Sequence, residues 1–259
     1  MQCPKCAAEN PPGTAICERC GIVFEKYYRY HPRPGEDAPP PVPAQLRGGA
    51  LRSDGGVRAL LWPADPKADW VSVGARGVLL LVLLFWGTAL MSSGIEGNAV
   101  GHSFLHLINL PFHEAGHVIF RPFGQFIQSL GGTLGQLLMP AICCGVLLIQ
   151  TRDPFGASVA LWWFGENFLD IAPYMADAQA GVLPLVGGNF GHSSPYGFHD
   201  WEFLLNESGL LHFDKALARG TFFFGSLIML AALIWGGLLL YGQYRAAAGG
   251  SSTDPGRHK

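Results

Sequence analysis

Charged residues are scarce in this chain, and the scarcity is confined to its last two thirds. Only 14% of the 259 residues are Asp, Glu, Lys or Arg, whereas a soluble globular domain carries about 25%. Ten of the 17 Lys and Arg residues precede Gly77, which leaves seven for all later positions. This pattern predicts a water-exposed first third followed by a membrane domain, and it argues against a single soluble domain.

The chain also lacks a strong net charge and an early apolar run. Its formal net charge is −2, which gives no electrostatic reason to expect a nucleic-acid partner. The first apolar run long enough to target a membrane begins near Gly77, so we expect no secretory signal peptide. The excess of Lys and Arg before Gly77 places the N-terminus in the cytoplasm by the positive-inside rule. Thiols stay reduced there and tend to ligate metals.

Composition divides the chain into four predicted parts. Two long uncharged apolar runs, 77–95 and 220–244, are each about the length of a membrane-spanning helix. The parts are a zinc ribbon at 1–28, a Pro- and Gly-rich linker at 29–76, a membrane metallopeptidase-like domain at 77–245 and a disordered tail at 246–259.

The region between the two apolar runs is harder to divide. Residues 99–121 are predicted as a helix bearing histidines, and 156–180 as a helix with polar positions. Residues 122–151 form either a kinked span or a re-entrant piece followed by a span. The loop at 181–214 contains no Lys or Arg, although five simple spans would place it in the cytoplasm. Either one middle segment does not cross fully, or loop charge is a poor guide here.

These features predict a mainly α fold. We expect a polytopic helical bundle with about four to five membrane segments, preceded by a small zinc-ribbon module. We therefore expect a multi-pass integral protein that lies in the lipid bilayer of a bacterial inner membrane. Its N-terminus is expected in the cytoplasm.

Four of the six cysteines form two CxxC pairs within the first 20 residues, namely Cys3, Cys6, Cys17 and Cys20. Four thiolates at this spacing suit a tetrahedral Zn²⁺ ion, and the pattern resembles the short zinc ribbons of many bacterial proteins. A segment this short has no apolar core, so the metal would supply its folding energy. We predict a closed structural zinc site that serves a protein partner or regulation, with a redox dithiol pair as the alternative.

An HExxH motif lies inside the apolar portion, at His113-Glu114-Ala115-Gly116-His117. Its two histidines fall on one face of a helix and can ligate one Zn²⁺ ion. Glu114 can act as a general base toward the water on that ion. Ionisable groups are costly inside a membrane and usually mark a functional site. The alternative is a polar interface between helices that binds no metal.

The polar stripe extends beyond the motif. At 100° per residue, His102, His106, Asn109, His113 and His117 fall within about 80° of one another. Such a line could carry water or protons to the metal, as hydrolysis inside a membrane requires. A second metal at His102 and His106 is an alternative, but we favour hydrogen bonds from these two histidines to neighbouring helices.

A third zinc ligand must come from farther along the chain, because residues 118–149 contain no His, Asp or Glu. Residues 112–117 and the later stretch Asn167-Phe168-Leu169-Asp170 resemble the two motifs of the site-2 protease family. The resemblance covers about residues 100–180. In that family, a membrane-embedded HExxH helix is followed by a later helix with a Leu-Asp-Gly motif, whose Asp is the third ligand. The resemblance therefore implies Asp170 as ligand, with Asn167 facing the same site.

The resemblance implies an intramembrane zinc endopeptidase with one catalytic zinc in addition to the structural one. His113, His117 and Asp170 would hold the catalytic ion, and Glu114 would transfer the proton. Asn167 would orient the substrate strand or stabilise the oxyanion. The substrate would be a membrane protein whose helix is locally unwound.

The residues by themselves leave other ligands and functions open. His192 or the pair His199-Asp200 could supply the third ligand, although we favour an amphipathic interfacial segment for that stretch. The alternative functions are a non-catalytic zinc-binding membrane scaffold or regulator, and a metal or proton transporter that uses the histidine line.

Overall fold

The computed structural model describes residues 1–31, 56–63 and 69–250 of the chain. The chain separates into two units, Met1–Asp54 and Gly55–Lys259. Within the described residues the fold is mainly helical, as predicted.

The first unit consists of two cysteine-bearing turns and a short helix, α1 (Phe24–Tyr30). Isolated antiparallel bridges join Gln2 to Glu9 and Ile16 to Val23, one beside each CxxC pair. Cys3, Cys17 and Phe24 form a small buried cluster. The unit is therefore built around its cysteines, because little other apolar surface is buried there.

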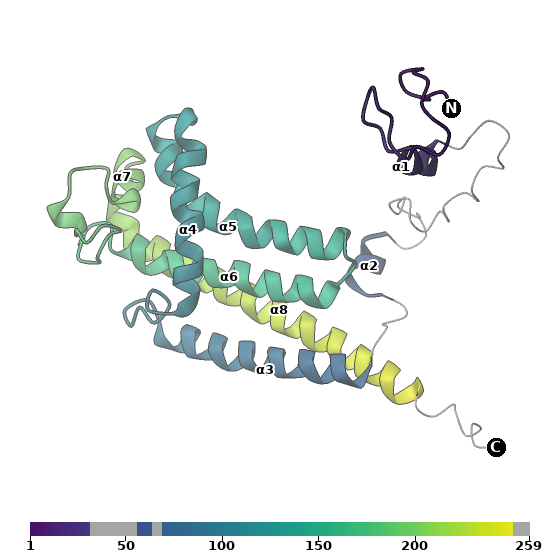
Figure 1. Ribbon diagram of the computed structural model, residues 1–259. Helices are drawn as coiled ribbons and strands as arrows, with labels where there is room; N and C mark the ends of the chain where they lie inside the picture. Colours follow the sequence, from purple (N-terminus) through teal and green to yellow (C-terminus); the bar gives the residue numbers. More distant parts are fainter. Residues whose placement is uncertain (32–55, 64–68, 251–259) are drawn as a thin grey trace. The chain divides into compact units, whose positions relative to one another are not determined.

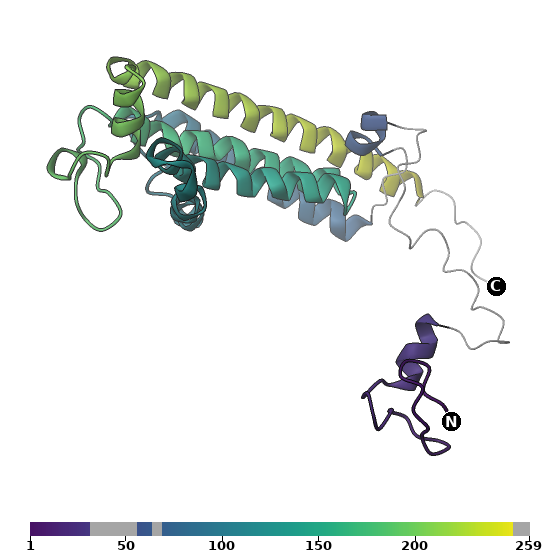
Figure 2. The ribbon, with the colours of Figure 1, turned by 90° about the horizontal axis from the view of Figure 1, so that it is seen from above.

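Four long helices of the second unit run alongside one another, and a fifth crosses them (Figures 1 and 2). The parallel set is α3 (Trp70–Ser93), α5 (Gln125–Ile149), α6 (Pro154–Ala176) and α8 (Asp214–Gly250), and the crossing helix is α4 (Phe104–Phe120). Short helices complete the unit: α2 (Gly56–Leu61), α7 (Asp200–Glu207) and 3₁₀ turns at Arg121–Phe123, Gly191–Ser193 and Leu211–Phe213.

Helix α6 is the centre of the bundle, packed against α5 on one side and α8 on the other. Glycines bring α6 and α8 into backbone contact: a Cβ on Gly165 would lie 2.9 Å from the Gly225 carbonyl oxygen. Around this crossing lies an apolar core that includes Leu169, Trp162 and Met229. Because α6 is covered by its neighbours, it tolerates the acidic residues Glu166 and Asp170, whereas α3 and α5 contain no Asp or Glu.

A second close contact joins α4 to α5. A Cβ on Gly116 would collide with the carbonyl oxygen of Gly131, and one on Gly131 would lie 2.8 Å from the Gly116 carbonyl oxygen. Gly131 and Gly135 have the small-xxx-small spacing that lets membrane helices approach closely. The small residue inside the HExxH motif thus makes room for a neighbouring helix.

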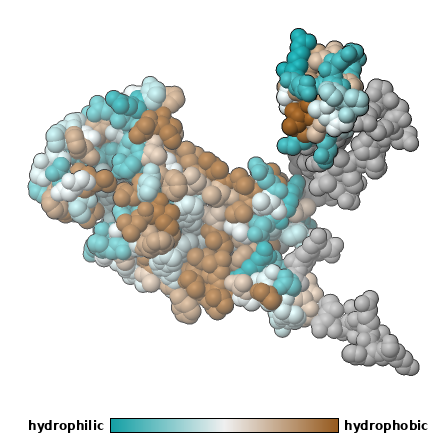
Figure 3. Space-filling model, viewed as in Figure 1, coloured by the Kyte–Doolittle hydropathy of each residue, from teal (hydrophilic) through white to brown (hydrophobic). Residues whose placement is uncertain are grey.

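Three helical segments among the described residues are long and apolar enough to cross a membrane: Trp70–Ser93, Gln125–Ile149 and Leu211–Gly249. Figure 3 shows apolar surface over the middle of the bundle and a hydrophilic end around α7. The two uncharged runs predicted as spans lie in α3 and α8. Residues 125–149 form one helix through Pro140, so this part has no re-entrant break.

Two predicted boundaries differ from the structure. The linker predicted at 29–76 contains α2 and the start of α3, because the Asp69 side chain accepts hydrogen bonds from the Val71 and Ser72 amides and caps the helix. The tail predicted to begin at 246 is helical to Gly250, since its first residues are alanines, which favour helix. Residues 32–55, 64–68 and 251–259 lie outside the described residues.

Candidate metal centre

Helix α4 presents the two motif histidines to α5, and α5 fixes the orientation of both rings. His117 Nδ1 lies 2.8 Å from the backbone carbonyl oxygen of Gln128. A carbonyl oxygen only accepts, so His117 Nδ1 carries a proton and its Nε2 is the ring atom left to bind a second proton or a metal ion. His113 Nδ1 lies 2.6 Å from Gln136 Oε1, and the amide oxygen fixes the same tautomer. Metal-binding histidines are usually held in this way.

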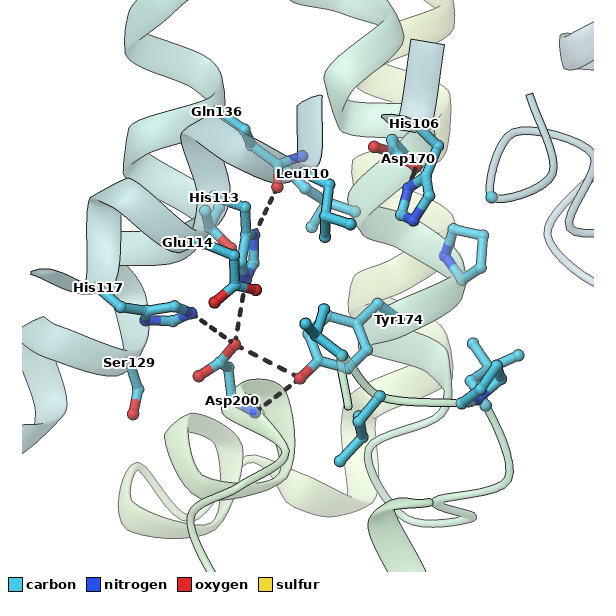
Figure 4. Close-up of a pocket in the computed structure, with 18 of the residues that line it drawn as sticks. His106, Leu110, His113, Glu114, His117, Ser129, Gln136, Asp170, Tyr174 and Asp200 are labelled. Carbon is cyan, nitrogen blue, oxygen red and sulfur yellow. Dashed lines mark hydrogen bonds and ion pairs between the residues drawn. The ribbon is translucent and has the colours of Figure 1, made fainter. Parts of the chain in front are cut away.

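The two free Nε2 atoms meet the carboxylate of Asp200, the first residue of α7 (Figure 4). Asp200 Oδ2 lies 3.2 Å from His113 Nε2 and 3.2 Å from His117 Nε2. Two ligands held about 2.0–2.1 Å from a tetrahedral ion are separated by about 3.4 Å. The observed spacing therefore fits one shared ion, and all three ligand atoms lie within 4.8 Å of one another.

The electrostatics of this arrangement also call for a cation. Two imidazole lone pairs facing a carboxylate oxygen repel it unless a positive charge lies between them. Either a proton on each ring or one metal ion meets that need. Two histidines and one carboxylate, with a fourth position left for water, form a donor set of the kind found in catalytic zinc sites. The group could thus bind a metal ion.

The Asp200 carboxyl is ionised, and its position is fixed by Tyr174. Burial raises the pKa of its carboxyl, but hydrogen bonds and charge attraction from His113 and His117 outweigh burial and lower the pKa below its ordinary value. The Asp200 backbone amide donates to the hydroxyl oxygen of Tyr174 at 3.0 Å. That hydroxyl in turn lies 3.4 Å from Asp200 Oδ2. The carboxylate is therefore anionic at neutral pH and anchored at its backbone.

The group lies on the wall of a cavity of about 930 Å³ formed by α4, α5, the end of α6 and the segment before α7. Glu114, between the two histidines in sequence, is exposed to this cavity and is seen beside them in Figure 4. The predicted stripe lines the same space, since His102 and His106 are also on the wall. His102 precedes α4, because Ser103 caps that helix.

Asp170, the ligand implied by the family resemblance, is not part of this group. Its Oδ1 lies 2.8 Å from His106 Nδ1, and its Oδ2 accepts from Asn109 Nδ2 at 3.0 Å. The reason is the crossing of α4 over α6, which sets Asp170 opposite the first turns of α4. The third member of the group is Asp200, which the sequence offers only as an alternative third ligand.

Asn167, predicted to orient substrate, does not line the cavity. Its side chain is fully buried, and Nδ2 donates to the Trp163 carbonyl oxygen one turn earlier in α6. The neighbouring Glu166 is also fully buried and accepts from Asn109. Glu166 thus joins α4 to α6, whereas Asn167 bonds within α6, and the structure gives its predicted catalytic role no support.

The two rival histidines have other partners. His199 caps α7, since its Nδ1 accepts from the Glu202 amide, and its ring stacks on Tyr174 at 4.3 Å. Its Nε2 faces Asp177 at 3.6 Å. His192 is exposed, and its Nδ1 lies 2.7 Å from the Gly181 carbonyl oxygen. His199 thus positions Asp200 from the adjacent residue and does not replace it.

Sequence reasoning missed the contribution of α5. Its polar residues recur at helical spacing in an otherwise apolar segment and line the cavity: Gln125, Gln128, Ser129, Thr133 and Gln136. A polar stripe on a membrane-length helix was the available signal. Gly132 lies within the same stripe, where a Cβ would collide with His113 Nε2 and lie 2.6 Å from His117 Nε2.

Gly132→Ala should therefore empty the metal centre while leaving the helix intact. We expect metal affinity to fall by at least about 100-fold, because outer-shell changes alone cost 10–100-fold and this one displaces both imidazoles. Gly145→Ala is the matched control, since a Cβ there meets nothing within 4 Å and α5 gains the same helix propensity. Competition with a zinc-sensitive dye measures both. Equal affinities in the two variants would show that the rings do not converge beside Gly132.

The four N-terminal cysteines form the second metal-binding group of the described residues. Cys3 Sγ lies 3.7 Å from Cys20 Sγ, and Cys6 Sγ lies 3.8 Å from Cys17 Sγ. A disulfide would bring sulfurs to about 2.05 Å, whereas sulfurs on one tetrahedral Zn²⁺ at about 2.3 Å lie about 3.8 Å apart. The spacing fits a closed four-thiolate metal site.

Comparison of the chain with protein-family models, with curated proteins and with solved structures finds no match. Inference about function therefore rests on the geometry of the site.

Proposed function

We propose that this protein is an integral-membrane zinc metallopeptidase that hydrolyses peptide bonds of membrane-protein substrates. The observation that carries the proposal is the convergence of His113, His117 and Asp200 on one point, with Glu114 on the wall of the same cavity. An HExxH helix alone is a weak signal. A third ligand from a distant element, with both imidazoles oriented by acceptors on α5, makes a metallopeptidase the best-supported reading.

The chain's own residues account for the steps around the ion. A bound Zn²⁺ supplies Lewis acidity toward the scissile carbonyl and lowers the pKa of a water molecule toward 7. Glu114 would accept a proton from the attacking water and deliver it to the leaving amine. Gln136 and the Gln128 carbonyl keep the imidazoles in the required tautomer. The Tyr174 hydroxyl holds Asp200 at its backbone amide.

The cavity suits an extended peptide. Its lining combines polar residues of α4 and α5 with apolar residues of the connection before α7, among them Leu183, Leu185 and Phe198. A peptide can use both kinds of lining residue, because its backbone forms hydrogen bonds and its apolar side chains make apolar contacts. The membrane-length helices support a location in a bilayer. The four-cysteine unit would bind structural zinc and contact a partner.

Proteolysis is tested with the purified full chain and a proteome-derived peptide library. We expect two zinc ions per chain, new peptide termini detected by mass spectrometry, loss of cleavage with a zinc chelator and recovery on adding Zn²⁺. Two bound ions without cleavage would favour the alternative of a zinc-binding scaffold or regulator. A single ion that disappears when the four N-terminal cysteines are replaced would overturn the second metal site altogether.

A further inference from the structure

The crossing helix α4 is not parallel to the helices that are long enough to span a membrane. It stands across α3, α5, α6 and α8 in Figure 1 and is viewed nearly along its axis in Figure 2. If the four parallel helices cross the bilayer, α4 lies roughly along its plane. Its outward residues Phe104, Leu107, Val118 and Ile119 are each more than 60% exposed. An apolar outer face over a histidine-lined inner face is the pattern of an interfacial helix.

The metal centre lies at one end of the bundle. Tyr174 is two residues before the end of α6. Gly132, which lies beside both Nε2 atoms, is the eighth residue of α5, about 10 Å from its start at 1.5 Å per residue. Asp200 lies beyond the bundle, in the connection between α6 and α8. The metal-binding group therefore lies nearer to one membrane surface than to the other.

Chain connectivity tells which end this is. α3 begins at the opposite end and finishes beside α4, and α5 starts, α6 finishes and α8 starts at the α4 end (Figure 1). With four crossings, the connection 177–213 lies on the side opposite the start of α3. Five crossings would have placed it on the same side.

Charge distinguishes the two sides. The connection 177–213 contains no Lys or Arg, and the α4 end carries Arg121, Lys215 and Arg219 as its basic residues. Ten basic residues precede Gly77, and Arg152 and Arg245 belong to the same side as the start of α3. The positive-inside rule then makes the start of α3 cytoplasmic. With four crossings, the connection 177–213, which lacks Lys and Arg, lies on the non-cytoplasmic side, as the positive-inside rule requires.

We infer that the metal cavity opens on the non-cytoplasmic surface of the membrane. It takes polypeptide from that side, namely segments of membrane proteins that emerge just beyond their spans. The sidedness stands on α4 and the charge distribution alone, whereas the substrate class rests on the proposed peptidase function. Near an interface, water reaches the metal directly, so the His102–His106 line is not needed as a water path through the bilayer.

Labelling of single cysteines in the full chain tests the sidedness. The parent carries Cys143→Ala and Cys144→Ala, and the probes are Ser193→Cys before α7 and Thr151→Cys between α5 and α6. Both replaced hydroxyls are exposed and bond only to a nearby backbone carbonyl. The reagent is a membrane-impermeant maleimide added to right-side-out membrane vesicles. The parent without a probe gives the background from the zinc-ribbon cysteines.

We expect Ser193→Cys to be labelled as fully before detergent as after it, and Thr151→Cys to be labelled only after detergent. The reverse pattern, or equal labelling of both probes in sealed vesicles, would overturn the proposal. Peptide cleavage is measured in the same vesicles, with the library added outside. Cleavage that requires detergent would also contradict the inferred opening. If even solubilised protein fails to cleave, the peptidase function fails while the labelling result still decides the sidedness.

Discussion

Glu114→Gln should abolish peptide cleavage and leave both metal sites filled. The amide keeps the size and the position of the carboxylate in the cavity but cannot accept a proton from water. General-base catalysis contributes about 10²–10⁴-fold, so we expect kcat to fall by at least that factor. Neither metal-binding group includes Glu114, so zinc content should not change. Rates with the peptide library and elemental analysis of the same sample provide the two measurements.

Glu96→Gln is the matched control for this variant. Glu96 is an exposed acid in the turn between α3 and α4, at the same end of the bundle, and it does not line the cavity. The Glu96→Gln protein should cleave peptides at the rate of the unmodified protein. A Glu114→Gln protein that cleaved as well as this control would remove the residue from the mechanism. Loss of zinc from Glu114→Gln would mean that the residue is a ligand.

Asp200→Ala should lose one of the two zinc ions, and Asp170→Ala should lose none. Removing Asp200 leaves two neutral imidazoles facing an open cavity, which hold zinc far more weakly than three ligands do. We expect a loss larger than the roughly 10–100-fold that outer-shell changes cause. Asp170 is bonded to His106 and Asn109, so its removal frees His106 without touching the ligands. Zinc per chain, measured by elemental analysis, separates the two variants.

The opposite result would restore the assignment that the family resemblance implies. If Asp170→Ala loses the ion and Asp200→Ala keeps it, α4 must rotate or slide along α6 when zinc binds. Misfolding is excluded by requiring that both variants retain the helical circular dichroism of the parent and its N-terminal zinc.

Local spacing explains why half of the site could be predicted from the sequence. His113 and His117 are one helical turn apart, and the four cysteines lie in two CxxC pairs, so chain geometry alone brings their ligand atoms together. The third ligand depends on how distant elements meet. Asp170 and Asp200 were both candidates, and the choice is made by the angle at which α4 crosses α6.

The fold was predictable to a similar extent. Two long apolar runs predict the helices α3 and α8, because hydropathy and length suffice to identify a span. Hydropathy and length do not give the orientation of a helix relative to its neighbours. The transverse orientation of α4 could therefore not be predicted from residues 99–121. The course of α4 includes the close contact between Gly116 and Gly131, and this contact cannot be predicted without knowing which helix lies beside α4.

A metal ion bound by this group would connect two separate parts of the chain, because Asp200 lies at the start of α7. Two ligands come from α4 and the third comes from the long connection between α6 and α8. By thermodynamic linkage, zinc strengthens the docking of α7 by the same factor by which docked α7 strengthens zinc binding. If the group binds zinc, the protection of this connection against amide exchange should rise with the free zinc concentration. Any molecule that pulls α7 away acts as a competitor of the metal without touching it.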